Sequence, residues 1–159
     1  MLGAAKGLEK EQVSGTDSPF EHTKILAVET LGAESLHASI SSRSLVSLPA
    51  ISSIAKSLGA VTVASSALSL SLSLSPPHVI SLTVKDSDAL TELEEFHKQT
   101  GVWVEPACSC SLSLVGGRRE LLEGRVGEGE AVVVVVCGGR GVSEEMVVDW
   151  RGKCFEPPS

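Results

Sequence analysis

The feature of this sequence that most constrains its fold is an apolar run, AVVVVVC, at residues 131–137. The run is too short to cross a bilayer, which takes about 20 apolar residues, and its β-branched valines disfavour a helix. A short apolar run bounded by glycines is typical of a strand that is buried on both faces, as in the middle of a parallel sheet. We therefore expect a buried strand that ends at Cys137 and is followed by a sharp turn through Gly138 and Gly139.

The turn after this expected strand is the first place to look for a ligand. In open α/β sheets, ligands bind just beyond the carboxyl ends of the strands. Here a thiol, Cys137, precedes two residues without side chains, where a flat ligand can come close to the backbone. We expect Cys137 to lie at the edge of any binding site. The competing interpretation is that Cys137 is a small core residue, as unpaired cysteines often are.

The rest of the sequence predicts an alternation of strands and helices. We expect strands at 24–30, 60–63, 78–85, 102–104 and 131–137, and helices at 33–42, 49–58, 86–100, 107–122 and 143–149, after the end of a helix at 1–11 and a loop at 12–22. Leucines alternate with serines at 65–75, which favours a strand, although a helix stays open. The alternation predicts an α/β fold, a parallel sheet with helices on both faces. We expect one unit over residues 1–149 and a loose tail at 150–159.

Composition argues against several classes of partner. The net charge of −7 is unsuited to nucleic acid, and an aromatic content of 3% is too low for a base-stacking or carbohydrate-binding platform. No apolar segment is long enough to span a membrane, and the first residues lack the features of a secretory signal. Four cysteines do not make a disulfide scaffold. We therefore expect a cytoplasmic protein that binds neither nucleic acid nor membranes.

Other motifs give weaker indications of chemistry. Cys108 and Cys110 could begin a metal site, but no second pair lies at a ligand spacing, so helix packing is favoured. The histidines are scattered at positions 22, 37, 78 and 97, and no catalytic role follows from their spacing. The sequence contains neither the nucleophile motif of the α/β-hydrolases nor a phosphate-binding glycine motif after a strand.

Three blocks of the sequence together resemble a known family. They read AVETLGAESLHASI at 27–40, SLPAISSIAKSLGAVTV at 47–63, and VEPACSCSLSLV at 104–115 followed by VVVVVCGG at 132–139. In this order and at this spacing they resemble the C-terminal half of the L-serine dehydratases, which are pyridoxal-phosphate enzymes of the tryptophan-synthase-β type. The resemblance implies part of the large domain of a fold-type-II enzyme, and a homodimer for the intact family.

The resemblance also implies an activity and a cofactor site. The family are lyases of amino-acid catabolism and gluconeogenesis that remove water and then ammonia from L-serine or L-threonine, giving pyruvate or 2-oxobutanoate. Cys137 corresponds to a thiol beside the pyridine nitrogen of pyridoxal phosphate, with Gly138 and Gly139 in the same turn. A weak, uncharged partner at that nitrogen suits β-elimination.

A monovalent-cation site is implied in the same way. Glu29 matches the acid of this site, and the backbone carbonyls of Ala33, Leu58 and Ala60 fall at the other ligand positions. One carboxylate and several carbonyls form the kind of oxygen cage that hard cations accept, here potassium. The competing interpretation of Glu29 is an acid that caps the helix following it.

The sequence departs from the family pattern in three respects. It lacks the Ser-x-Lys-x-Arg-Gly type of motif that carries the Schiff-base lysine, the glycine tetrad for the cofactor phosphate, and the small domain that grips the substrate carboxylate. We therefore predict no catalytic residue in this chain, and expect a truncated protein that is inactive alone. The alternative is a pseudo-enzyme or a non-catalytic interaction protein derived from a dehydratase. The choice between serine and threonine as substrate stays open.

Overall fold

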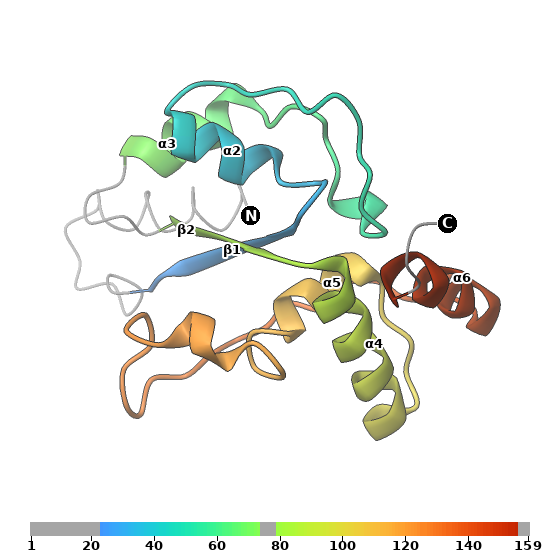
Figure 1. Ribbon diagram of the computed structural model, residues 1–159. Coiled ribbons are helices and arrows are strands. Elements are labelled where there is room, and N and C mark those ends of the chain that lie inside the picture. The colour runs from blue at the N-terminus through green and yellow to red at the C-terminus, as the bar shows by residue number, and fades with distance from the viewer. Residues whose placement is uncertain (1–22, 74–78, 156–159) are drawn as a thin grey trace.

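The centre of the computed structural model, which describes residues 23–73 and 79–155, is a pair of parallel strands (Figure 1). β1 (Ile25–Thr30) and β2 (Val79–Val84) pair along their whole lengths, with Ile25 opposite Val79 and Thr30 opposite Val84. Parallel neighbours need a long crossover between them. The described part of this crossover comprises α2 (Ser35–Ser42), a loop with the 3₁₀ turn η1 (Lys56–Leu58), and α3 (Ser65–Ser73).

Helices cover both faces of the strand pair (Figure 1). On one face, Ala27 and Val79 pack with Leu36 of α2 and Leu70 of α3. The other face carries α4 (Asp86–Thr100) and α5 (Pro106–Leu112), and its cluster consists of Val28, Leu82, Val84, Ala89, Cys110 and Leu114. The predicted α/β class, a parallel sheet with helices on both faces, is confirmed.

α4 forms where its sequence signals predict it. Asp86 and Asp88 lie in its first turn, where carboxylates favour the positive end of a helix. Gly101 ends the helix in the left-handed region at φ 73°, which glycine adopts without strain. Leu90 and Leu93 are fully buried in a cluster that also contains residues of α5 and α6.

The last helix, α6 (Glu144–Phe155), is longer than expected. The expectation of a loose tail from residue 150 is wrong as far as Phe155. Trp150 and Cys154 pack against the cluster around Leu90 and Leu93, and this burial holds the final turns in place. None of the described helices is long and apolar enough to span a membrane.

The valine run is the main disagreement with the sequence analysis. Residues 131–137 pair with no strand among the described residues, and Val133 and Val135 are 86% and 73% exposed. Val134 packs against the cluster around Leu90, and Cys137 contacts α5. The apolar pattern reports that the segment is suited to burial. Burial on both faces requires neighbouring strands, and the described chain supplies none beside it.

Two other predicted elements also differ. Residues 65–73 form a helix, in which the hydroxyl of Ser71 donates to the carbonyl of Ala67, so the serines are accommodated. Residues 49–58 are not helical before η1, because the Ser52 and Ile54 amides bond outside the segment, to Gly32 and Asp86.

The remaining predicted strands and helices are shortened. Residues 60–63 form only the bridge between Ser47 and Thr62, and 102–104 form no strand. The helix expected at 107–122 stops at Leu112 and is followed by the 3₁₀ turn η2 (Arg119–Leu122). The expectations for residues 1–22 lie outside the described residues.

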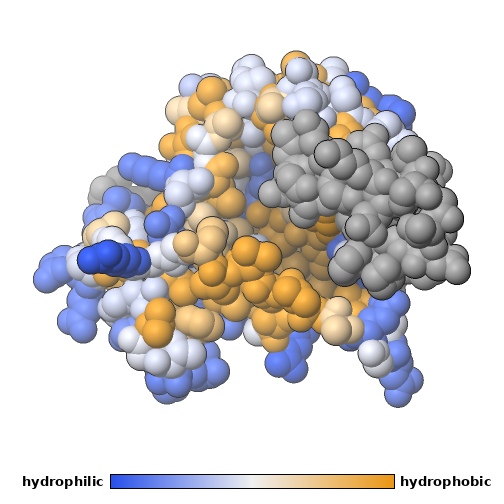
Figure 2. All heavy atoms as spheres, turned by 180° about the vertical axis from the view of Figure 1, so that it is seen from behind, coloured by the Kyte–Doolittle hydropathy of each residue, from blue (hydrophilic) through white to orange (hydrophobic). Residues whose placement is uncertain are grey.

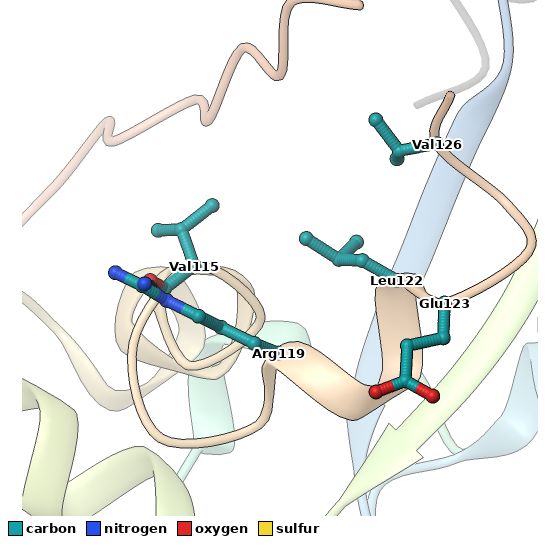
Figure 3. A pocket seen from close by; sticks show the side chains of 5 residues that line it. All are labelled: Val115, Arg119, Leu122, Glu123 and Val126. Atoms are coloured by element: carbon teal, nitrogen blue, oxygen red, sulfur yellow. Dashed lines mark hydrogen bonds between the residues drawn. The ribbon is translucent and has the colours of Figure 1, made fainter. Parts of the chain in front are cut away.

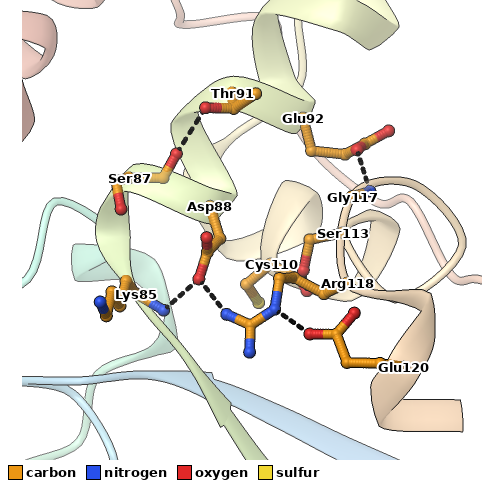
Figure 4. Close-up of polar contacts among 10 residues, drawn as sticks. All are labelled: Lys85, Ser87, Asp88, Thr91, Glu92, Cys110, Ser113, Gly117, Arg118 and Glu120. Carbon is orange, nitrogen blue, oxygen red and sulfur yellow. Dashed lines mark hydrogen bonds and ion pairs between the residues drawn. The ribbon is translucent and has the colours of Figure 1, made fainter.

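A charged network fixes the segment after α5 to α4 (Figure 4). The Arg118 guanidinium donates to Asp88 Oδ2 and Glu120 Oε1, both at 2.5 Å. This guanidinium lowers the pKa of the Glu120 carboxyl. The Gly117 amide donates to Glu92 of α4 at 3.3 Å. These contacts hold the chain leaving α5 beside the N-terminal half of α4.

A buried polar network joins the carboxyl ends of the two strands. The hydroxyls of Thr30, the last residue of β1, and Ser53 lie 2.7 Å apart, and the Ser53 hydroxyl donates to Asp86 at 2.5 Å. The amide of Ala55 donates to the Ser53 oxygen at 2.9 Å, and the amide of Ile54 donates to Asp86 at 3.0 Å. Thr30 and Ser53 are 0% and 2% exposed. The loop at 52–55 is thereby tied over the edge of the sheet.

The variant Ser53→Ala is expected to lower the free energy of unfolding by about 1–3 kcal/mol, because it leaves buried polar groups of Thr30, Ala55 and Asp86 with fewer partners. Urea denaturation followed by circular dichroism measures the change. The matched control is Ser52→Ala, an exposed serine of the same loop, which should stay within about 0.5 kcal/mol of the parent. Equal effects of the two variants would contradict the role of the network.

Candidate functional site

The candidate site lies where the end of the valine run meets the segment before α5. The Glu105 amide donates to the Gly138 carbonyl at 3.2 Å. A Cβ on Gly139 would lie 1.9 Å from the Trp103 carbonyl oxygen, and a Cβ on Gly138 would lie 2.9 Å from the Glu105 carboxylate. The two glycines therefore permit a close approach of two backbone segments that other residues would prevent.

A third segment joins the same place. The Ser57 hydroxyl, in η1, donates to Glu105 Oε2 at 2.7 Å. Glu105 directly precedes α5, whose first residue is Pro106, a position that proline tolerates. The segments around Ser57, Glu105 and Gly138 come from the sequence blocks 47–63, 104–115 and 132–139. The fold thus brings together three separate blocks of the resemblance.

Cys137 faces a second thiol at this junction. Its Sγ lies 3.7 Å from Cys108 Sγ, and its backbone amide donates to Cys108 Sγ at 3.4 Å. Cys137 is exposed, whereas Cys108 is 4% exposed in the first turn of α5. The interpretation of Cys137 as a core residue is therefore wrong. The Cys108 thiol, and the charge of Glu105 to a smaller extent, raise the pKa of Cys137, so the thiol is neutral at pH 7.

These residues fit one edge of a flat heteroaromatic cofactor. Cys137 offers an exposed, uncharged sulfur that donates or accepts only weak hydrogen bonds. Gly138 and Gly139 follow it without side chains that could cover its sulfur. Such a group can stand against a ring nitrogen without protonating it. The pairing of Cys137 with the pyridine nitrogen itself remains a prediction.

Glu29 has a structural role at the N-terminus of α2. Its two carboxylate oxygens accept the backbone amides of Leu36 at 3.1 Å and His37 at 2.7 Å. The competing interpretation, an acid that caps the following helix, is confirmed by these bonds. Burial raises the pKa of the Glu29 carboxyl, and the two amides partly oppose that rise. A role of Glu29 as a cation ligand stays a prediction.

The residues expected to supply carbonyl ligands have different surroundings. Ala33 is buried in the turn before α2, and its amide donates to the Thr30 carbonyl at 2.9 Å. Leu58 packs its side chain against the cluster on the α4 and α5 face, while Ala60 is exposed. Glu29 instead bonds to α2, on the opposite face of the strands. The assembly of these carbonyls around one ion therefore stays a prediction.

Cys110 packs inside the protein, as the sequence analysis favoured. Its Sγ donates to the Ala107 carbonyl at 3.0 Å, and burial raises its pKa to about 12. In the part of the chain that the structure describes, no three His, Cys, Asp or Glu side chains gather as a metal site would require. The Cys-x-Cys motif is thus a packing feature, and Cys108 is paired with Cys137 instead of Cys110.

The hollows of the surface lie away from this junction. One, of about 420 Å³, is formed by Val115, Leu122 and Val126, with Arg119 and Glu123 at its sides (Figure 3). A larger one, of about 730 Å³, lies along α4 and is lined by acidic residues such as Glu92 and by residues of the segment after α5. Neither contains Cys137. Apolar side chains also gather on the molecular face seen from behind in Figure 2.

Sequence reasoning missed the contacts of Cys108 and Ser57. Cys108 was considered only with Cys110, because the two share a motif. Its contact with Cys137 joins residues 29 positions apart, and the bond from Ser57 to Glu105 joins residues 48 apart. The available signal was that Ser57, Glu105 and Cys108 all lie in the blocks that carry the resemblance.

The variant Gly139→Ala is expected to separate the two backbone segments, because its Cβ would collide with the Trp103 carbonyl. We expect a loss of more than about 1 kcal/mol in the free energy of unfolding and faster maleimide labelling of Cys108 in the native protein. Gly141→Ala is the matched control, since a Cβ there meets no heavy atom within 4 Å. If Gly139→Ala matched this control in both measurements, the close approach would be refuted.

Comparison with known proteins gives consistent results. The family model described as "Pyridoxal-phosphate dependent enzyme" matches residues 1–138. The L-serine dehydratase/L-threonine deaminase of Bos taurus is 35% identical over 154 residues, which cover 93% of this chain and 43% of the relative. The mouse protein of the same name is 41% identical over 128 residues, 78% of this chain and 38% of the relative.

Solved structures agree with the fold. An L-serine ammonia-lyase from Rhizomucor miehei superposes with a TM-score of 0.76 at 28% identity, covering 96% of this chain and 46% of that protein. A bacterial-type threonine deaminase, with a TM-score of 0.52 and 20% identity over 60% of this chain and 32% of its own, shares the fold. The chain thus spans less than half the length of these relatives. With the family model matched from residue 1 to residue 138, the chain belongs to the family of pyridoxal-phosphate dependent enzymes.

Proposed function

We propose that this chain supplies the ring-nitrogen side of the cofactor site in a pyridoxal-phosphate-dependent ammonia-lyase acting on L-serine or L-threonine. The observation that carries the proposal is the exposed, neutral Cys137 thiol at the junction of the three blocks. Relatives named L-serine dehydratase/L-threonine deaminase support the substrate class. As further proposals, the protein is cytoplasmic, acts in amino-acid catabolism and gluconeogenesis, and is a homodimer when it includes the remainder of the relatives' length.

Bound pyridoxal phosphate supplies an electron sink for loss of the α-proton and the β-hydroxyl. The residues of this chain bind and orient the ring. Cys137 keeps its proton at neutral pH and offers the ring nitrogen neither a strong acid nor an anion. Gly138 and Glu105 hold the Cys137 turn against the start of α5, and Ser57 fixes the Glu105 carboxylate. No proton transfer is assigned to a side chain of this chain, since its sequence lacks the lysine motif of the resemblance.

We also propose that Glu29 supports a potassium ion together with the carbonyls of Ala33, Leu58 and Ala60. Burial raises the pKa of Glu29, so its ionised form carries a cost that the two α2 amides only partly offset. A cation beside the carboxylate would offset more of that cost. Each carboxylate oxygen has a second lone-pair direction beyond the one used by its amide.

A second candidate function is that of a non-catalytic interaction protein. The exposed valines favour it, since Val133 and Val135 offer apolar surface that another chain could cover. This candidate predicts no uptake of the cofactor and stable co-purification with a partner. The tests of the catalytic proposal therefore distinguish the two.

The first test of the catalytic proposal uses a chimera. Residues 23–139 of this chain replace the matching part of the bovine relative, and pyruvate and 2-oxobutanoate formation from L-serine and L-threonine is measured together with the absorbance of bound cofactor. We expect turnover by the chimera and none by this chain alone. A chimera that folds and binds pyridoxal phosphate but turns over neither substrate would contradict the proposal. Turnover by the chain alone would refute its predicted inactivity.

The second test follows Glu29 across pH in the parent and in Glu29→Gln. The pKa of Glu29 is raised above its ordinary value of 4.5 by folding, so the protonated group stabilises the fold at low pH. This contribution is lost as pH rises through the folded pKa. Relative to Glu29→Gln, the parent should therefore lose stability between about pH 4 and 7 in thermal unfolding.

Potassium chloride should reduce this loss, whereas tetramethylammonium chloride at the same ionic strength should not. Glu128→Gln, at an exposed glutamate, is the matched control and should behave as the parent at every pH. Equal stability in the two salts would refute the cation proposal and leave the pKa direction intact.

A further inference from the structure

We propose that Cys108 and Cys137 are a redox modification site, which forms a reversible disulfide by exchange with a low-molecular-weight disulfide such as glutathione disulfide. The pair is already in contact, with 3.7 Å between the sulfurs and the Cys137 amide directed at Cys108 Sγ. A disulfide needs about 2.05 Å, so the sulfurs must approach by roughly 1.7 Å. No element of the fold has to come apart for this approach.

The two sides of the pair differ in freedom. Cys108 is fixed in α5, whose first turn is held by the Cys108 and Ser109 amides donating to the Glu105 carbonyl. Cys137 ends a run that pairs with no described strand, and its neighbour Val136 is exposed. The bond from the Glu105 amide to the Gly138 carbonyl keeps Cys137 close while its side chain remains free to turn.

The order of attack follows from exposure. Cys137 is exposed and meets glutathione disulfide first, whereas Cys108 is 4% exposed and reacts only with a sulfur already beside it. The Cys137 thiolate attacks one sulfur of glutathione disulfide, and a glutathione thiolate leaves with the electron pair of the broken bond. The Cys108 thiolate then attacks the Cys137 sulfur and expels the second glutathione.

The exchange is balanced without a further reactant. Two cysteine thiols are oxidised to one disulfide, one glutathione disulfide is reduced to two glutathione thiols, and the two cysteine protons end on those thiols. The groups facing Cys137 are the Cys108 thiol and the Glu105 carboxylate, and both raise its pKa. The first attack needs the thiolate, so the exchange should become faster as pH rises above neutral.

The other cysteines are poor competitors. Cys110 is 0% exposed, its sulfur bonds to the Ala107 and Val28 carbonyls, and its pKa is about 12. Cys154 lies on α6, packs against the cluster around Leu90, and burial raises its pKa to about 11. The pairing of Cys137 with Cys108 is therefore selective by position and by exposure.

The consequence for catalysis rests on the proposed function. A Cys108–Cys137 disulfide removes the S–H of Cys137 and draws its sulfur towards α5. The ring nitrogen would then lose its partner, and oxidised protein would hold the cofactor less well. Reduction by excess glutathione or dithiothreitol would restore the thiol.

The test is mass spectrometry of the full chain after incubation with glutathione disulfide. We expect a loss of about 2 Da, a Cys108–Cys137 cross-linked peptide, and complete reversal by dithiothreitol. Cys108→Ser should stop at the mixed disulfide on Cys137, a gain of about 305 Da for one glutathione. Cys137→Ser, at an exposed position, should gain neither product. Cys110→Ser and Cys154→Ser are the matched controls and should form the disulfide at the parent rate.

A parent protein that keeps all its thiols, stops at the glutathione adduct, or links other cysteines would overturn the proposal. Its failure is separable from that of the proposed function, because this readout needs no cofactor. In the bovine chimera, saturating pyridoxal phosphate should slow disulfide formation several-fold. An unchanged rate there would leave the disulfide standing and contradict the contact between Cys137 and the cofactor ring.

Discussion

The parallel pairing of β1 with β2 is the constraint on which the rest of the described structure depends. Strands that run in the same direction need a crossover, and here α2 and α3 lie in it and cover one face. Both strands also end at the same edge, which brings Thr30 and Asp86 together. Ser53 links them, so the loop that leads to η1 is tied to that edge. Ser57 in η1 can then reach Glu105, and the site inherits its position from the strand register.

The site itself depends on backbone contact more than on side chains. Gly139 lets the turn after the valine run lie against Trp103, and the Gly138 carbonyl accepts the Glu105 amide. This contact sets Cys137 beside Cys108 at the start of α5. One thiol is buried and the other exposed, so a single pair combines a fixed anchor with an accessible group. A cofactor neighbour and a redox pair are two uses of the same arrangement.

Local signals predicted the parts of the fold that depend on local interactions. Acids at the start of α4, its apolar stripe and Gly101 at its end lie within one segment, and that helix formed as expected. The valine run failed because burial of a strand depends on neighbours, which no local pattern reports. The serine–leucine segment kept both options open, since packing of Leu68 and Leu70 decided for a helix. Cys137 was singled out from its position before two glycines, but its partner lies 29 residues away and could be known only from the fold.

The exposed valine run also bears on solubility. Residues 131–136 combine the strongest β-propensity of the chain with unpaired backbone, which is a template for edge-to-edge association. A net charge of −7 keeps molecules apart near neutral pH. At the isoelectric point, near pH 5.1, that repulsion vanishes while the valines stay exposed. The same segment that marks the site therefore makes mild acid the condition under which the isolated chain precipitates first.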